Sequence, residues 1–175
     1  ETQTLEALVA QGDQNLVITK LQKARQNIDL AQADVRENIL SLRTTLSNEA
    51  GVIPALQEYL AEFGVQTGIK VIFENEIHND INVSPMTETQ MVCIIQEALS
   101  NVRKHAHAKK VLLHMRSIND CLRVSVTDDG VGFTHSPGHR SFGLQTMRER
   151  AEGVGGGLTV TAQPGQGTQV NLWLP

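Results

Sequence analysis

Long apolar segments are absent from this chain of 175 residues. No apolar run approaches the roughly 18 residues that a membrane-spanning helix needs, and the segment Glu1–Leu5 lacks the basic and apolar regions of a signal peptide. We therefore expect a cytoplasmic fragment without direct membrane contact. Because the first residue is Glu rather than Met, we interpret the chain as a piece of a longer protein, for which a membrane anchor elsewhere stays open.

Cysteine clusters and an excess of positive charge are also missing. The two cysteines, Cys93 and Cys121, form no spaced metal or redox motif, so we interpret both as packing residues in a reducing compartment. The formal net charge of -4 disfavours a nucleic-acid partner, because binding to phosphate backbones requires clustered Lys and Arg. A single nucleotide pocket is still compatible with this balance, since it needs only one or two local cations.

Residues 1–48 are predicted to form a helical hairpin. The break at Gly12-Asp13-Gln14 separates a short first arm from a segment without Pro or Gly that runs from about Asn15 to Leu46. Apolar residues recur in this segment at intervals of seven: Leu21, Ile28, Val35 and Leu42. Such a heptad seam is typical of a dimerising bundle. A hairpin that folds back on its own domain is the alternative.

Residues 50–175 are predicted to form a separate domain in which helices and strands mix. The patterns predict helices over 52–63, from Pro85 past residue 100, and over 142–153, and strands over 69–74, 110–117, 121–128, 158–162 and 169–174. The core stripe of the long middle helix consists of Met91, Ile95, Ala98 and Val102. We expect the α+β class, as a two-layer α/β sandwich with a mixed or antiparallel sheet and helices on one face.

The first candidate site lies on the long helix. Glu97, Asn101 and Lys104 follow each other at spacings of four and three, so they share a face opposite the core stripe. A carboxylate, an amide oxygen and an ammonium together suit Mg²⁺ and phosphates. An ordinary solvated helix face is the alternative.

The second candidate site follows the strand that ends at Asp128. Gly130 and Gly132 remove side chains where the backbone must bend or approach a flat ligand, and a carboxylate there can accept a hydrogen bond from an amine such as that of adenine. An ordinary turn after a strand is the alternative. Only Asp128 keeps the Asp-x-Gly-x-Gly spacing, so we expect Asp129 to be less sensitive to substitution.

The third candidate site is the start of the helix over 142–153. Gly143 keeps its first turn open, and backbone N–H groups at a helix N-terminus bind phosphate. The alternative is a capped amphipathic helix on which Arg148 and Arg150 are solvated.

Three segments carry a family resemblance, and they appear in the order Gln96–Ala106, Asp128–Phe133 and Gly143–Ala151. They resemble the catalytic domain of bacterial two-component sensor histidine kinases of the nitrate-sensor subfamily, in the GHKL ATPase superfamily. The resemblance covers about residues 50–175, and Asp34–Arg43 resembles the second helix of that family's dimerisation and phosphotransfer domain.

The resemblance implies a role for each residue of the long helix. Asn101 would hold Mg²⁺, and Glu97 would assist proton removal from the phosphoacceptor histidine. Lys104 would neutralise phosphate charge, and His105 would line the nucleotide site. A metal pair of His105 and His107 is disfavoured, because residues two apart on a helix diverge.

The resemblance also implies roles for the second and third segments. Asp128 would bind the adenine amine, Gly130 and Gly132 would shape the floor of the site, and the hydroxyl of Thr168 would lie on the adenine side. At the end of a lid over residues 133–142, the phosphates would be bordered by Gly143 and Leu144.

The chain departs from the family in its phosphoacceptor. All six histidines lie outside the hairpin, at positions 78, 105, 107, 114, 135 and 139. We therefore expect a fragment that binds ATP and Mg²⁺ but cannot autophosphorylate alone. The γ-phosphoryl would pass to a histidine on an upstream helix and then to a response regulator, in a full-length homodimer.

The three motifs are also compatible with two other functions. An ATPase of the same superfamily could use hydrolysis to drive a conformational change, although the short lid and the heptad hairpin disfavour it. A nucleotide-binding module without turnover is the other alternative, and intact Glu97, Asn101 and Asp128 weigh against it.

Overall fold

The structure is a computed structural model that describes residues 51–77, 83–119, 121–133 and 142–175. The predicted hairpin of residues 1–48 and most of the predicted lid lie outside these residues. Among the described residues, no helix combines the length and the apolar character that a membrane crossing requires.

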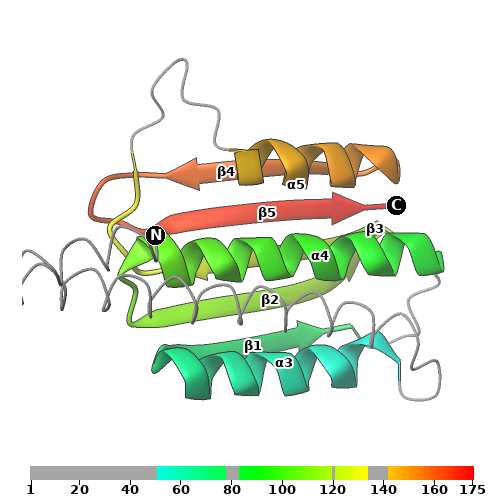
Figure 1. Cartoon of the computed structure of the whole chain (residues 1–175). Helices are drawn as coiled ribbons and strands as arrows, with labels where there is room; N and C mark the ends of the chain where they lie inside the picture. Colours follow the sequence, from blue (N-terminus) through cyan, green and yellow to red (C-terminus); the bar gives the residue numbers. More distant parts are fainter. Residues whose placement is uncertain (1–50, 78–82, 120, 134–141) are drawn as a thin grey trace, which may run out of the picture. The chain divides into compact units, whose positions relative to one another are not determined.

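A five-stranded mixed sheet forms one layer of the domain (Figure 1). Its strands are β1 (Lys70–Glu76), β2 (Lys110–Ile118), β3 (Cys121–Asp128), β4 (Gly157–Ala162) and β5 (Thr168–Leu174). They lie in the order β1-β2-β3-β5-β4. Only β1 and β2 are parallel, and the other neighbours pair antiparallel. Because β5 inserts between β3 and β4, its first residue, Thr168, lies beside the end of β3.

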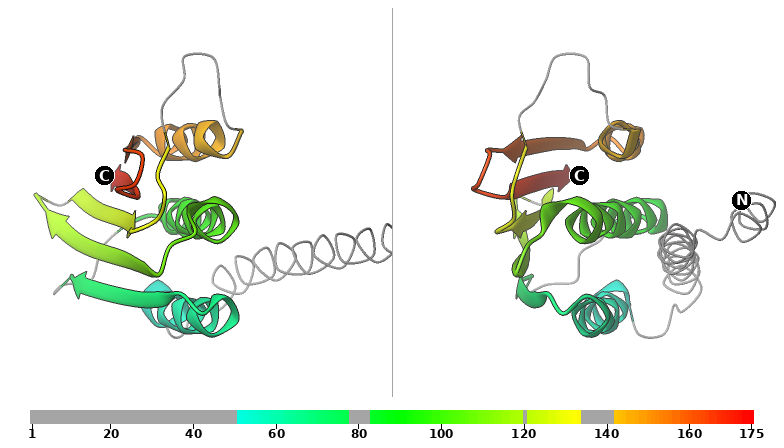
Figure 2. Two further views of the ribbon diagram at one scale, coloured as in Figure 1. Left: turned by 90° about the vertical axis from the view of Figure 1, so that its left-hand side faces the viewer. Right: turned by 60° about the vertical axis from the view of Figure 1, so that its left-hand side comes forward.

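Helices form the second layer and cover one face of the sheet (Figure 2). They are α3 (Val52–Thr67), α4 (Pro85–Asn101) and α5 (Phe142–Gly153). Strand residues alternate accordingly: Val111, Leu113 and Met115 of β2 are fully buried towards the helices, while the residues between them face the other side. A mixed sheet with helices on one face confirms the predicted α+β sandwich.

The central helix α4 lies between α3 and α5 (Figure 1). Ser84 caps it by accepting a hydrogen bond of 3.1 Å from the Thr87 N–H, and Pro85 occupies the first turn, where its missing N–H costs nothing. All four residues of the predicted core stripe are buried: Met91, Ile95, Ala98 and Val102. Ile94 and Leu99 are buried as well, because α4 has neighbours on more than one side.

The end of α4 differs from the sequence prediction. The chain continues from Asn101 into a π-helix, η1 (Val102–Ala106), and leaves it through His107 in the left-handed region at φ 50°. The sequence pattern predicted one continuous α-helix through Lys104. A π-helix is wider than an α-helix and frequently marks a functional site.

The predicted strand and helix pattern is otherwise confirmed within a few residues. The hairpin of β2 and β3 closes through Asn119, which takes a left-handed conformation at φ 51°. The helix predicted over 52–63 extends to Thr67, where Gly68 ends it in the left-handed conformation and donates its N–H to the Gly64 carbonyl at 3.0 Å.

Candidate functional site

Asp128, the last residue of β3, lies buried at one end of the sheet. Its Oδ1 accepts the Gly130 N–H at 2.8 Å, and the backbone N–H and the hydroxyl of Thr168 donate to the same carboxyl group. Burial raises the pKa of Asp128, the negative charge of Asp129 adds to this, and the bonds from Gly130 and Thr168 oppose it. The structure thus brings together Asp128 and Thr168, which lie 40 positions apart in the sequence.

Gly130 and Gly132 allow the loop after β3 to touch other backbone segments directly. A Cβ at Gly130 would collide with the Ala106 carbonyl group, with the carbonyl carbon at 2.8 Å. A Cβ at Gly132, which has φ 59°, would collide with the carbonyl groups of Gln163 and Gly167. The two glycines are therefore needed for close packing of the protein against itself. The sequence pattern could not distinguish this role from close approach to a ligand.

Hydrogen bonds tie the same loop to the end of η1 and to the β4–β5 turn. Val131 donates its N–H to the Ala106 carbonyl at 2.8 Å, and Gly165 donates its N–H to the Val131 carbonyl at 2.7 Å. The loop after β3 is thus held from both sides by backbone groups.

Asp129 has a separate role that the sequence did not predict. Its Oδ1 accepts the backbone N–H groups of Lys109 at 2.8 Å and Lys110 at 2.9 Å. The pKa of the exposed Asp129 carboxyl is lowered, mainly by the hydrogen bond from the Lys110 N–H and next by that from the Lys109 N–H. The carboxylate fixes the turn between η1 and β2, and a lower sensitivity of Asp129 than of Asp128 to substitution stays a prediction.

The helix residues of the site are more exposed than the loop. Glu97 and Asn101 are half-buried on α4, whereas Lys104 and His105 are exposed in η1. The predicted α-helical spacing therefore holds for Glu97 and Asn101 only. Lys104 follows in a wider turn, because the helix changes its hydrogen-bond pattern after Asn101.

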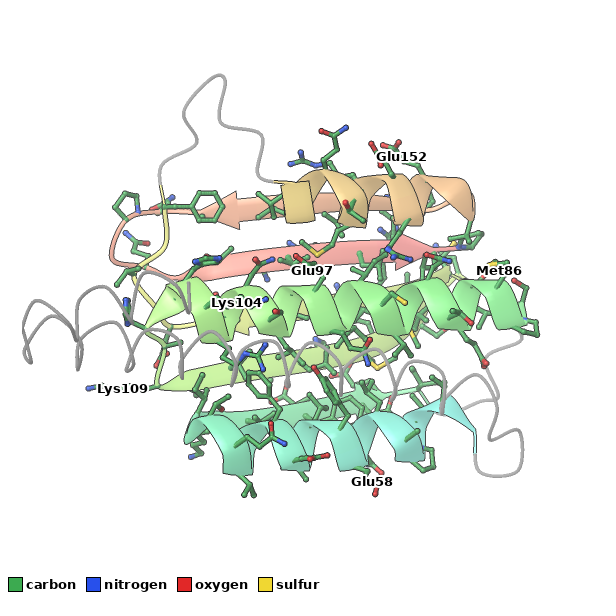
Figure 3. The ribbon with its side chains drawn as sticks, in the orientation of Figure 1. Glu58, Met86, Glu97, Lys104, Lys109 and Glu152 are labelled. Carbon is green, nitrogen blue, oxygen red and sulfur yellow. The ribbon has the colours of Figure 1, made fainter. Side chains whose placement is uncertain are left out.

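Glu97 and Gly143 come from different motifs and meet between α4 and α5. A Cβ at Gly143 would collide with Oε1 of Glu97 and would lie 3.2 Å from its Cδ. Figure 3 shows Glu97 on the side of α4 that faces α5. The carboxylate lies beside the positive N-terminal end of α5, at the position for which the sequence predicted a phosphate. Leu144 follows Gly143 in the same turn and is half-buried.

The residues present fit a nucleotide and a hard cation. The Asp128 carboxylate, held by Gly130 and Thr168, is an acceptor suited to an amine. Glu97 and Asn101 offer oxygen ligands. No group of three or more His, Cys, Asp or Glu in the described parts of the chain could hold a metal. Mg²⁺ takes oxygen ligands, often one or two from the protein together with the phosphates of its substrate.

Residues 86–175 match the family model described as histidine kinase-, DNA gyrase B-, and HSP90-like ATPase. The chain belongs to this ATPase family. The matched range contains every predicted site residue of the ATPase domain, from Glu97 to Thr168.

Curated relatives of the ATPase domain are sensor kinases. The chain is 31% identical over 159 residues to the signal transduction histidine-protein kinase/phosphatase DegS of Brevibacillus brevis, covering 90% of the chain and 41% of DegS. It is 35% identical over 146 residues to the sensor histidine kinase LiaS of Bacillus subtilis, covering 83% of the chain and 40% of LiaS. The chain therefore spans about two fifths of the length of these relatives. The matches confirm the predicted ATP-binding catalytic region of sensor histidine kinase type.

A solved structure shows the same fold. The histidine kinase domain of a blue-light activated histidine kinase from Erythrobacter litoralis matches with a TM-score of 0.68 and 23% identity, covering 98% of this chain and 85% of that chain. At this identity the likeness supports the architecture of the ATPase domain and no residue role.

Proposed function

We propose that this chain binds Mg²⁺ and ATP and, within a longer protein, transfers the γ-phosphoryl group to a histidine on an upstream helix. The observation that carries the proposal is Asp128, a buried carboxylate at the end of β3 that Gly130 and Thr168 hold in place. A response-regulator aspartate would then receive the phosphoryl group.

The adenine end of the site rests on Asp128 and Thr168. Asp128 would accept a hydrogen bond from the exocyclic amine of adenine, while the Thr168 hydroxyl and N–H hold the carboxylate in place. Because the carboxylate is already oriented before ATP arrives, little ordering of the protein is needed on binding. The loop with Gly130 and Gly132 keeps Asp128 at this depth through its contacts with Ala106 and Gln163.

The phosphate end rests on α4, η1 and the start of α5. Asn101 would hold Mg²⁺, which neutralises charge on the phosphates, and Lys104 would add a positive charge from η1. His105 would line the nucleotide site, and Gly143 with Leu144 would border the phosphates. Backbone N–H groups of the first turn of α5 would donate to phosphate oxygens.

Glu97 would act on the acceptor histidine. In the transfer, the bond between the γ-phosphorus and the β–γ bridging oxygen breaks, a bond from the imidazole nitrogen to phosphorus forms, and ADP leaves. Glu97 would take the proton that the imidazole loses. Its carboxylate now lies beside Gly143, so a phosphate bound at the start of α5 would repel it and favour its rotation away from α5.

Several finer assignments accompany this proposal. The segment over residues 1–48 would be part of a dimerisation and phosphotransfer hairpin, and the full-length protein would be a homodimer. The nitrate-sensor subfamily rests on the resemblance of Gln96–Ala106 and its companion segments, whereas the relatives found carry other names. A cytoplasmic location and the inability of the fragment to autophosphorylate also stay predictions.

Binding of a fluorescent ATP analogue with Mg²⁺ tests the nucleotide site. Asp128→Asn keeps the shape of the side chain and removes its charge, so we expect a dissociation constant about 10–100-fold higher, as for a lost hydrogen bond to a charged group. Glu58→Gln removes an exposed carboxylate on α3 and serves as the matched control. Equal affinity of Asp128→Asn and wild type would refute the assignment.

Phosphotransfer is tested separately with ATP labelled on the γ-phosphate. A longer chain that includes the upstream helix should acquire label that is lost in acid and stable in base, as expected of a phosphohistidine. Glu97→Gln should reduce the rate of labelling more than ATP binding. Bound ATP without any labelled histidine would leave the nucleotide site in place and overturn the kinase proposal.

A further inference from the structure

The sheet face opposite the helices holds a cavity of about 540 Å³. Figure 2 shows this face without a covering helix in the described parts of the chain. The walls include His114, Arg116, Arg123, Ser125, Asn171 and Trp173. No carboxylate is among the described residues that line it, although the whole chain has a net charge of -4.

Two arginines lie directly opposite each other in this cavity. Arg116 of β2 and Arg123 of β3 are register partners, and both are exposed on the open face. Like charges in register on neighbouring strands are destabilising by themselves. An oxyanion between them would remove the repulsion, because each guanidinium can donate two parallel hydrogen bonds to a carboxylate or phosphate.

Acidic residues of β1 lie beside the β2 side of this cavity. Glu76 is the register partner of Arg116, and its Oε1 lies 3.2 Å from Nε2 of His114. That contact lacks hydrogen-bond geometry, since the buried Nε2 has no hydrogen-bond partner among the described residues. Glu74, the register partner of His114, is a second carboxylate on β1, whereas Arg123 lies one strand further from β1 than Arg116.

Trp173 provides a fixed apolar wall. It is the register partner of both Arg123 and Gly157, because β5 lies between β3 and β4. A Cβ at Gly157 would lie 2.8–2.9 Å from Cε2 and Cζ2 of the indole, so the ring rests on the glycine. The Arg123 guanidinium lies 5.9 Å from the ring centroid, within cation–π range.

We propose that this cavity binds a small organic oxyanion, a carboxylate or phosphate carried on a compact carbon body. Arg116 and Arg123 would take the oxyanion, Ser125 and Asn171 would donate to further polar groups, and Trp173 would contact the carbon body. The volume lies within the roughly 300–1,000 Å³ typical of small-molecule sites. The site is distinct from the nucleotide site, since Arg123 and Asp128 lie near opposite ends of β3 and point to opposite faces of the sheet.

Intrinsic fluorescence gives a direct test, because Trp173 is the only tryptophan of the chain. Citrate and pyrophosphate are titrated separately at constant ionic strength, as probes for the carboxylate and the phosphate. We expect a saturable change in Trp173 emission with at least one of them. Arg116→Gln should raise the dissociation constant at least about tenfold, because a charge-assisted bidentate pair is lost.

Two variants control this test. Arg148→Gln removes an equal charge from an exposed position on α5 and should bind the probe like wild type. Arg116→Lys keeps the charge without the guanidinium fork and should restore only part of the affinity. Far-ultraviolet circular dichroism verifies that each variant is folded, and binding of the fluorescent ATP analogue should stay unchanged in Arg116→Gln.

The probes also separate the sources of the oxyanion. Saturation by citrate alone assigns a carboxylate ligand, and saturation by pyrophosphate alone assigns a phosphate ligand. The proposal is overturned if neither probe gives a saturable change, or if Arg148→Gln weakens binding as much as Arg116→Gln. A pyrophosphate response that ATP abolishes, and that Arg116→Gln leaves intact, would belong to the nucleotide site and would overturn it equally.

Discussion

Two regions meet at the predicted nucleotide site, and they are built in opposite ways. The loop region, Asp128–Gly132 with Gly167 and Thr168, consists of backbone held against backbone around a buried carboxylate. The helix region, from Glu97 to His105, presents half-buried and exposed side chains on α4 and η1. The loop region is ordered by the protein itself, whereas the helix region offers charges and oxygen ligands to a partner.

This difference indicates which effects a substitution has in each region. In the loop region a change disturbs the fold and the site together, because its polar groups already bond to each other. In the helix region a change should alter ligand binding with little effect on folding. Substitutions in each region can test this separation.

Gly130→Ala should have the largest effect. The new methyl group would collide with the Ala106 carbonyl, and neither backbone segment can yield easily, since Val131 donates to the same carbonyl. We expect the free energy of unfolding to fall by about 1–3 kcal/mol, as for an overpacked site. Urea unfolding measures it. Gly153→Ala is the matched control, because a Cβ there meets nothing within 4 Å, and its stability should be unchanged or higher.

ATP affinity should depend on pH through Asp128. Burial raises the pKa of this carboxyl, and the ionised form accepts a hydrogen bond from adenine more strongly than the protonated form. As the pH falls through the raised pKa, the dissociation constant for ATP should rise by up to about tenfold per pH unit. In Asp128→Asn this part of the pH dependence should vanish. An identical pH profile of the two proteins would contradict the role of Asp128.

Asp129→Ala should have a smaller effect on both folding and binding. It removes the acceptor of the Lys109 and Lys110 N–H groups and so loosens the turn that follows η1. We expect a lower unfolding temperature and a several-fold weaker binding of ATP. Asp129→Asn keeps an acceptor oxygen and should restore part of both. Full activity and stability of Asp129→Ala would show that η1 holds its position without this carboxylate.

The two neighbouring aspartates should also respond to pH in opposite directions. The raised pKa of Asp128 means that its contribution to folding is greatest in acid and is lost as the pH rises through that value. The lowered pKa of Asp129 means that its contribution is present at neutral pH and is lost in acid, below the ordinary carboxyl range. Stability curves of the two alanine variants against pH should therefore diverge.

Lys104→Ala should have the smallest effect. Lys104 is exposed in η1, so its attraction for phosphates is screened by salt. We expect about 2–5-fold weaker binding of ATP at low ionic strength, a difference that disappears at high salt, and little change in unfolding. Lys109→Ala, at another exposed lysine, is the control. A large loss of stability in Lys104→Ala would break the proposed separation of the two regions.

The sequence alone supported much of the fold. The order of the helices and strands, the core stripe of α4, the hairpin of β2 and β3 and the α+β class followed from apolar periodicity, turn residues and helix caps, which act over a few neighbouring positions. The three ordered motifs also predicted the ATPase family that the comparison with known proteins shows.

Only the tertiary structure decided how distant segments touch. Thr168 reaches Asp128 because β5 lies beside β3, and the contacts of Gly130 with Ala106 and of Glu97 with Gly143 depend on how loops and helices pack, for which no local pattern codes. The π-helix η1 escaped prediction because its sequence continues an α-helical pattern. The cavity around Arg116, Arg123 and Trp173 likewise exists only because strand register places three separate strands side by side.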